Sequence, residues 1–312
     1  MSKSLVGKFF IKAEGAYKEY KGNKAFDAGN YIKAKNAYQE LYVLYKYELG
    51  EKHPDTLDAL EALAISYECL GDYNKVFEMR KAVYNGRKEF LDENNPDTLT
   101  SLSNLAISYY HLGDYNKALK TENKVYNARK EVLGERDLDT LTSLSNLAIF
   151  YSNLGDHNKA LEMENRVYNS RKQIMGERDL DTLTSLSNLA ITYSDLGDYN
   201  KAMKLHEEVY VLRKQILGVN HPDTLTSLFN LAGSYSDLGD YSKAFELHNT
   251  VYNARKEILG EAHPDTLTSL SNLAISYSNL GDYNKAMKLH EEVYISRKQI
   301  LGVNHSDTLR SL

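Results

Sequence analysis

The stretch NPDTLTSLSNLAISYYHLGDYNKALKTENKVYNARKEVLG, residues 95–134, carries two markers that recur along the chain. The triplet DTL returns every 42 residues without insertion or deletion, and a glycine that mostly opens the pattern GDxxK keeps the same step. The triplets begin at Asp55, Asp97, Asp139, Asp181, Asp223, Asp265 and Asp307, and the glycines are Gly29, Gly71, Gly113, Gly155, Gly197, Gly239 and Gly281. A fixed period of about 20 to 50 residues is typical of stacked structural units rather than of a globule with one core. The sequence therefore predicts a solenoid.

Each unit has the start and stop signals of two helices. Asn95 is a favourable N-cap, and Pro96 suits the first helical position, where a missing N–H costs nothing. Gly113 can adopt the left-handed conformation that ends a helix, and Asp114 can cap the helix that follows. Apolar residues between these signals recur at steps of three and four, which draws one buried helical face. We therefore predict an all-α fold of antiparallel hairpins, each of about 16 plus 19 residues.

The composition excludes several classes of protein. The chain has 312 residues and a formal net charge of −5 with both signs interspersed, so no basic field is present to hold nucleic acid. Cys69 is its one cysteine, which excludes a disulfide framework and a thiolate metal site. No run approaches the roughly 18 apolar residues of a membrane span, and the start lacks a signal-peptide core. We expect a cytoplasmic protein that binds neither membrane nor nucleic acid and contains no cofactor.

The pattern NLAxxYxxLGDYxKA, at Asn104–Ala118, resembles the tetratricopeptide repeat. The longer period, in which RK in the second helix is followed by LG and then HPDTL, is similar to the 42-residue variety found in kinesin light chains. This resemblance implies a right-handed superhelical solenoid of stacked helix hairpins.

We expect four parts in the chain. Residues 1–14 are an N-terminal segment, residues 15–54 a divergent capping unit, residues 55–306 six complete units, and residues 307–312 the start of a truncated further repeat. No polar capping helix follows the last complete unit. Either the array continues beyond these residues, or its last unit exposes apolar surface that supports self-association.

The resemblance also implies a binding surface. In the tetratricopeptide repeat family the first helices line a concave groove, and a recurrent asparagine bonds the backbone of a bound peptide. The matching positions are Asn104, Asn146, Asn188, Asn230 and Asn272, and Ala62 interrupts the series. Helical spacing places two more series on the same face, namely Thr100, Thr142 and Thr184, and Ile107, Ile149, Ile191 and Ile275. Alternatively, the asparagines bond between neighbouring units inside the array, and the isoleucines are partly buried there.

Two further series recur on the second helices. His206, His248 and His290 share one position, which we expect to be semi-buried and polar, with Glu164 as a candidate partner of His206. A metal site is not expected, because stacked helices lie roughly 8 to 10 Å apart, whereas zinc needs nitrogens at about 2.0 to 2.1 Å. Arg–Lys pairs form a regular ridge, for which we expect a solvated, salt-bridged face or else a site for an acidic partner. The pairs are Arg87-Lys88, Arg129-Lys130, Arg171-Lys172, Arg213-Lys214, Arg255-Lys256 and Arg297-Lys298.

These patterns favour a non-catalytic scaffold that binds a protein partner, as an extended peptide or a helix, in its concave groove. The alternative is the ligand-recognition array of a larger signalling protein whose effector or nucleotide-switch domain lies outside this chain. An enzyme is not expected, because the sequence contains no phosphate-binding loop, nucleophile motif or HExxH motif. The sequence leaves open whether the groove or the basic ridge is the binding face.

Overall fold

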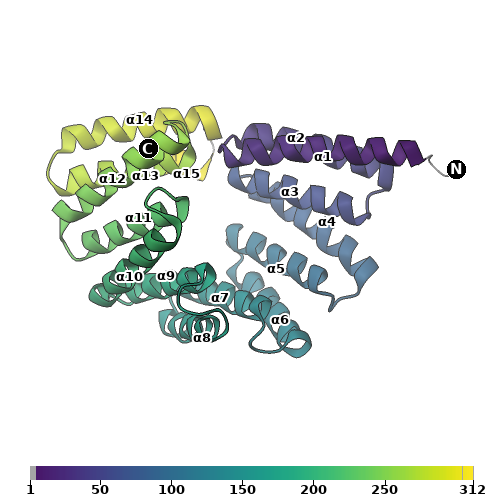
Figure 1. Cartoon of the computed structure of the whole chain (residues 1–312), viewed down its shortest axis with the longest axis horizontal. Coiled ribbons are helices and arrows are strands. Elements are labelled where there is room, and N and C mark those ends of the chain that lie inside the picture. The colour runs from purple at the N-terminus through teal and green to yellow at the C-terminus, as the bar shows by residue number, and fades with distance from the viewer. Residues whose placement is uncertain (1–4, 304, 312) are drawn as a thin grey trace. The chain divides into compact units, whose positions relative to one another are not determined.

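The computed structural model describes residues 5–303 and 305–311, which form fifteen helices and no strand. The helices follow one another as antiparallel hairpins joined by short loops (Figure 1). The chain divides after Val132 into two compact units, and we describe each by itself. The predicted all-α solenoid of helix hairpins is confirmed.

The six regular hairpins have first helices of 16 residues and second helices of 19, as predicted. The first unit contains α1 (Leu5–Asp27), α2 (Tyr31–Leu49), α3 (Pro54–Cys69), α4 (Tyr73–Leu91), α5 (Pro96–His111) and nearly all of α6 (Tyr115–Leu133). The second unit contains α7 (Leu138–Asn153), α8 (His157–Met175), α9 (Leu180–Asp195), α10 (Tyr199–Leu217), α11 (Pro222–Asp237), α12 (Tyr241–Leu259), α13 (Pro264–Asn279), α14 (Tyr283–Leu301) and α15 (Ser306–Leu309). Helix α1 crosses residue 15, where the divergent unit was expected to begin.

Local signals set the ends of the helices. The side chain of Asn95 accepts a hydrogen bond from the backbone N–H of Asp97 at 2.9 Å. A histidine does the same at the start of α13, where His263 Nδ1 accepts from the Asp265 N–H at 3.1 Å. Gly113 follows α5 with a φ of 80°, in the region that glycine tolerates best. Each helix boundary is therefore encoded within a few residues.

The first hairpin packs through glycines on α1 and tyrosines on α2. A Cβ atom at Gly15 would come within 2.1 Å of the Tyr45 hydroxyl, and one at Gly22 within 2.5 Å of the Tyr38 ring. Tyr38 is buried, and its hydroxyl donates to Asn23 Oδ1 at 2.6 Å. The close approach of α1 to α2 therefore requires glycine at both positions, and it holds the two rings against α1.

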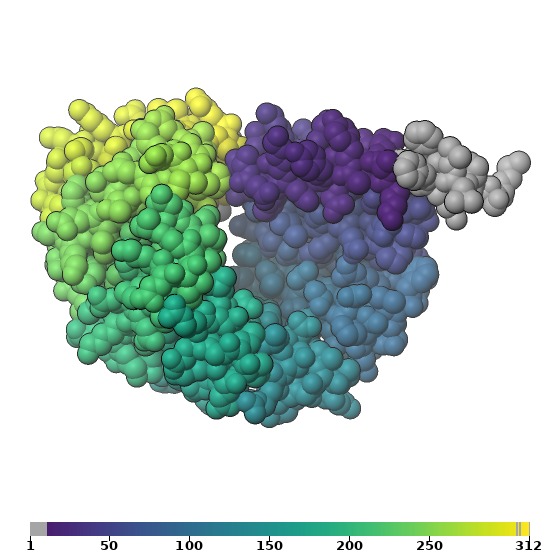
Figure 2. All heavy atoms as spheres, in the orientation of Figure 1, coloured from purple at the N-terminus to yellow at the C-terminus, as the bar shows by residue number. Residues whose placement is uncertain are grey.

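Leucine, alanine and valine fill the interior of the regular hairpins. In one cluster Leu183, Leu186 and Leu189 of α9 pack with Val209 of α10, and each is at most 4% exposed. Burying such a side chain contributes about 1.5 to 3 kcal/mol. Neighbouring hairpins within each unit lie directly against one another (Figure 2), so that each hairpin completes the core of the next.

Arginines of five second helices link their hairpin to the segment that follows it. Arg213 of α10 donates from Nη1 to the Asp223 carbonyl at 3.4 Å and to the Ser227 hydroxyl at 3.0 Å, both on α11. Its Nη2 donates to Thr184 Oγ1 of α9 at 2.7 Å, so one guanidinium joins three helices. We call the residues with this arrangement the bridging arginines; they are Arg87, Arg171, Arg213, Arg255 and Arg297. In Arg87 the contact to threonine is replaced by an ion pair with Asp58 at 2.5 Å.

The expected solvated ridge of Arg–Lys pairs is wrong for the arginines. At 7% exposure or less, four of them are buried, namely Arg129, Arg213, Arg255 and Arg297, and the other two are half-buried. The lysines that follow them are mostly exposed. The planar guanidinium has five N–H donors, so it can satisfy oxygens on two neighbouring helices at once, which a lysine cannot do. In the sequence the two cations look alike, and only the stacking separates them.

We expect Arg213→Ala to lower the stability of the second unit by about 2 to 4 kcal/mol, because it removes three hydrogen bonds and buried side-chain volume. The matched control is the exposed neighbour, Lys214→Ala, which should cost less than about 0.5 kcal/mol. Urea unfolding followed by circular dichroism measures both. Equal midpoints for the two variants would show that the arginine does not hold the hairpins together.

Candidate functional site

The predicted groove residues lie on the first helices of the hairpins. In the second unit the threonine, asparagine and isoleucine occupy the same three positions of α7, α9 and α13. In the first unit α5 carries all three, at Thr100, Asn104 and Ile107. The structure therefore places each series on one repeated helix, and the environments of the three series differ.

The isoleucines of the second unit are open to solvent. Ile149, Ile191 and Ile275 are 41%, 45% and 46% exposed, and we call them the isoleucine row. Helix α11 has Gly233 at this position, and nothing lies within 4 Å of where its Cβ would be. Ile107, in the first unit, is half-buried. The isoleucine row is therefore partly covered within the array, as the alternative allows, and each side chain still exposes more than 40% of its surface.

The asparagines are half-buried and bond within the array. Asn188 Nδ2 donates to Ser145 Oγ at 3.4 Å, and Asn230 Nδ2 donates to Ser187 Oγ at 3.3 Å, in each case on the preceding first helix. Asn104 donates to the Glu61 carboxylate at 3.1 Å, and Asn272 donates to the Thr268 carbonyl at 3.0 Å. Asn146 of α7 has the same half-buried environment. The hydrogen bonding inside the array that the sequence left open as an alternative is therefore present, and for Asn104, Asn188 and Asn230 it joins neighbouring hairpins.

The threonines contribute to the stacking. Thr184 accepts from Arg213, as described above, and its hydroxyl donates to the Leu180 carbonyl at 2.9 Å. Thr142 repeats this arrangement with Arg171 and the Leu138 carbonyl. In the first unit Thr100 accepts from Arg129 at 2.9 Å. These hydroxyls are therefore already engaged by the protein.

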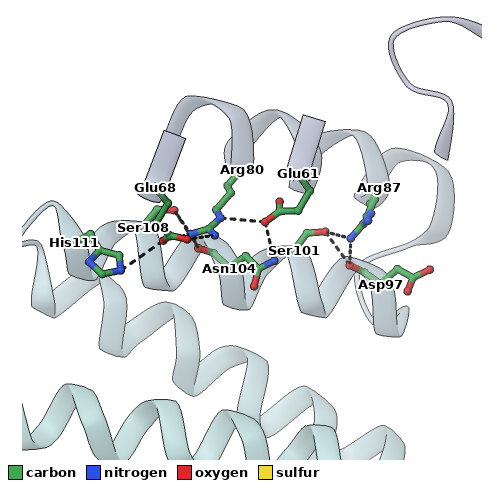
Figure 3. A network of polar contacts seen from close by, with 9 residues as sticks. All are labelled: Glu61, Glu68, Arg80, Arg87, Asp97, Ser101, Asn104, Ser108 and His111. Atoms are coloured by element: carbon green, nitrogen blue, oxygen red, sulfur yellow. Dashed lines mark hydrogen bonds and ion pairs between the residues drawn. The ribbon is translucent and has the colours of Figure 1, made fainter. Parts of the chain in front are cut away.

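A buried ion-pair network joins α3, α4 and α5 in the first unit (Figure 3). Arg80 is 4% exposed; its Nε lies 3.1 Å from a Glu61 oxygen, and its Nη atoms lie 2.8 Å from the two Glu68 oxygens. Burial opposes the charge of Arg80, but the two carboxylates hold its pKa above the ordinary value. Burial lowers the pKa of His111, whose Nε2 lies 3.5 Å from Glu68.

Sequence reasoning missed this network. The sequence does contain a sign of it, because Glu61, Glu68 and Arg80 all differ from the residues at the same positions of the later 42-residue repeats. A position-by-position comparison of the repeats would have shown these three exceptions together. The network therefore marks α3–α4 as chemically distinct from the hairpins that follow.

The position of Arg80 on the second helices holds buried ionisable groups in the second unit as well. Glu164 is 2% exposed and accepts from Ser145 Oγ at 2.9 Å, and burial raises its pKa to about 7. His206 and His248 are each 4% exposed, with Nδ1 2.8 Å from the hydroxyls of Ser234 and Ser276.

Burial lowers the pKa of both His206 and His248 to about 4. They are more buried than the sequence predicted, whereas His290 is half-buried as expected. The predicted pairing of Glu164 with His206 is wrong, because each bonds a serine instead.

A comparison with protein-family models identifies one family along most of the chain. The family model for the tetratricopeptide repeat matches five overlapping stretches, which are residues 77–131, 97–173, 139–212, 181–257 and 231–299. A search of curated proteins found no match. None of the helices within residues 5–303 and 305–311 is long and apolar enough to cross a membrane.

Three solved structures illustrate the similarity. A kinesin light chain from Podosopora anserina with nearly identical TPR-like repeats is 27% identical, with a TM-score of 0.54 over 66% of this chain and 97% of that one. NprR in complex with its cognate peptide NprX is 16% identical, with a TM-score of 0.65 over 99% of this chain and 87% of that one. A signal-transduction ATPase with numerous domains from Pyrococcus horikoshii, which has a tetratricopeptide repeat sensor, is 17% identical, with a TM-score of 0.59 over 99% of this chain and 46% of that one.

We expect the double variant His206→Phe/His248→Phe to flatten the dependence of stability on acid. The folded pKa values of about 4 lie below the ordinary 6.5, so the unfolded chain takes up these protons first. The stability from the neutral imidazoles is complete above pH 6.5 and is lost as the pH falls toward 4. At pH 5.5 the two histidines together should cost about 3 kcal/mol in the unmutated chain. Urea unfolding at pH 7.5 and 5.5 measures the difference.

Glu164→Gln should act in the opposite direction. The folded pKa of about 7 lies above the ordinary 4.5, so this carboxyl group binds a proton on folding between those values and stabilises the fold as the pH falls. The glutamine removes that gain, and the loss of stability toward pH 5.5 should become steeper. Identical slopes in the unmutated chain and in both variants would show that these groups titrate as if in solvent.

Proposed function

Because the chain belongs to the tetratricopeptide repeat family, whose fold is generally a non-catalytic interaction scaffold, we propose that it binds a protein partner along its first helices. The partner presents an extended peptide or a helix to the concave face formed by these helices. The scaffold itself performs no catalysis and acts by holding its partner. We place this activity in the cytoplasm, in line with a chain whose one cysteine, Cys69, cannot form an internal disulfide.

The isoleucine row is the observation that carries this proposal. Isoleucine is ordinarily one of the most buried residues, yet three first helices of the second unit hold a strongly exposed one at the same position. The second helices also expose isoleucines, but the isoleucine row shares its helical face with the asparagine series. Covering each exposed part would contribute about 1 to 2 kcal/mol to binding. A ligand that lies across successive first helices would meet these side chains at regular intervals, which suits an extended chain better than a compact molecule.

The asparagines supply the polar part of the surface. The contacts of Asn188 and Asn230 to serine each use one amide hydrogen, and both side chains are half-buried rather than enclosed. An amide both donates and accepts, so the second hydrogen and the oxygen suit the backbone of a peptide without selecting its sequence. The bond to serine also fixes the rotamer of the amide, which lowers the entropy lost on binding.

A second candidate is the alternative that the sequence raised, in which the array is the sensor of a larger signalling protein. Two proteins of similar fold motivate it: NprR, which was solved with its cognate peptide, and the ATPase with a tetratricopeptide repeat sensor. Both candidates use the same peptide-binding face. They differ in whether a switch domain is attached, and sequencing the gene on both sides of this chain decides between them.

We expect the triple variant Ile149→Ser/Ile191→Ser/Ile275→Ser to lose at least about tenfold in affinity for its ligand, since 1.4 kcal/mol is a factor of ten. The probe is a linear peptide selected on the unmutated chain from an unbiased displayed library. Fluorescence anisotropy measures its Kd, and circular dichroism should show the helices intact.

The matched control replaces three isoleucines of similar exposure on the second helices of the same unit. Ile174, Ile216 and Ile258 are 44%, 38% and 46% exposed. Changing all three to serine should leave the Kd within about twofold, because a ligand on the first helices does not reach them. If this control loses the peptide and the first variant keeps it, the binding face lies on the second helices and the proposal is wrong.

A further inference from the structure

A cavity of about 710 Å³ lies in the first unit between α1, α2 and α3. Pockets for small ligands measure about 300 to 1,000 Å³ and combine apolar walls with a few polar groups. The walls here include Ile11, Leu41 and Leu49 beside the rings of Tyr38 and Tyr45. The cavity therefore has the size and the mixed lining of a small-ligand pocket, which is more than large enough to admit one long side chain.

The cavity continues the face on which the groove residues lie. Asp58 and Ala62 of α3 contribute to its wall, and they occupy the positions of Thr100 and Asn104 on α5. Ala62 lacks the amide that the later first helices carry, so the space that an asparagine would fill stays open. The interruption of the asparagine series at Ala62 thus coincides with the cavity.

The tyrosine wall is held in place before any ligand arrives. Tyr38 is fixed by its hydrogen bond to Asn23, and close packing on Gly22 prevents its ring from moving toward α1. Gly15 confines Tyr45 in the same way. A pocket whose walls are already ordered loses less entropy on binding than one that must form around its ligand.

The charges of the lining are mainly negative. Glu19, Glu48, Asp55 and Asp58 contribute carboxylates, whereas Lys12 is the one lysine among the lining residues. Asp58 is paired with Arg87 outside the cavity lining, at 2.5 Å. Burial raises the pKa of the Tyr45 hydroxyl, and the nearby charges of Asp55 and Glu19 raise it further, so the field at this ring is negative.

We propose that this cavity receives the side chain of a lysine or arginine from the peptide that the first helices bind. Its apolar walls match the aliphatic stem of such a side chain, while the tyrosine face and the carboxylates match the cationic head. The proposal rests on the peptide-binding function above, and it assigns to the first unit the recognition of a cationic side chain.

The test uses the full chain with ¹³C-labelled tyrosine rings. Three small probes are titrated into it, and the signals of Tyr38 and Tyr45 are followed by NMR. The probes are N-acetyl-argininamide, its neutral isostere N-acetyl-citrullinamide, and putrescine, a cation without a peptide backbone. We expect the arginine probe to bind at least about fivefold more tightly than the citrulline probe, because opposite charges attract strongly near a protein surface. Equal binding of the two, or no response up to about 20 mM, would overturn the proposal. Tighter binding of putrescine than of the arginine probe would overturn the peptide as the source of the cation.

Two variants locate the binding. Ala62→Asn restores the side chain of the other first helices and should block the arginine probe, while Glu19→Gln should weaken it about fivefold. Glu208→Gln removes the same charge from an exposed position of α10 and should change nothing. Loss of response in Glu208→Gln, or an unchanged response in both Ala62→Asn and Glu19→Gln, would place the probe elsewhere and overturn the assignment.

The serine variant of the isoleucine row separates this proposal from the one on which it rests. It lies in the second unit and should leave the arginine probe unaffected while it weakens the selected peptide. If the probe binds the cavity normally but no peptide depends on the isoleucine row, the cavity stands and the proposed groove fails. If the peptide depends on the row but the probe does not respond, the groove stands and the cavity proposal fails.

Discussion

The bridging arginine is the contact on which the spacing of the hairpins depends. A buried guanidinium needs oxygen partners, and the two Nη atoms of Arg213 find them on its own hairpin at Thr184 and on the next hairpin at Ser227. An added or deleted residue between these positions would rotate one helix and leave the charge without an acceptor. The strict step of 42 residues is therefore what this contact requires, since apolar packing alone tolerates slippage better than a directional hydrogen bond does.

The hydrogen bonds that hold the hairpins together also involve polar side chains on the proposed binding face. Thr184 lies on the face where a ligand is proposed to bind, yet its hydroxyl accepts from Arg213 and donates to its own helix. Asn188 likewise gives one hydrogen to the preceding first helix. The polar side chains of this face are thus partly occupied by hydrogen bonds within the array, whereas the exposed surface of the isoleucine row is not needed for stacking. Apolar contact is therefore the larger part of what the repeated surface offers a partner, and the asparagines add hydrogen bonds that any backbone accepts.

The fold could be predicted because helix caps and terminal glycines act locally. The environments of the site residues could not, because they depend on contacts between neighbouring hairpins. Caps such as Asn95 and terminal glycines such as Gly113 act over a few residues, so hairpin lengths followed directly from the sequence. The burial of Arg213 did not, because an arginine beside an exposed lysine looks solvated until the next helix is placed over it. The same holds for Arg80, whose partners Glu61 and Glu68 lie 19 and 12 residues away on the preceding helix. The isoleucine row was on the predicted face, but its exposure depends on the packing of neighbouring hairpins.

Because the 42-residue repeats are nearly identical, few places on the surface can select one ligand sequence over another. Residues 181–222 and 265–306 differ at five positions, so they present almost the same surface twice. A surface that repeats itself recognises a repeating feature, such as a peptide backbone, and cannot by itself set the register of a sequence. Register requires a place where the repeat is broken, and the largest break lies in the first unit, at α1 to α4. There Ala62 replaces asparagine, carboxylates replace neutral residues and Arg80 is neutralised inside the protein by two glutamates. Under the proposed function, discrimination between ligands therefore falls to the irregular hairpins α1 to α4 of the first unit, where the surface does not repeat itself.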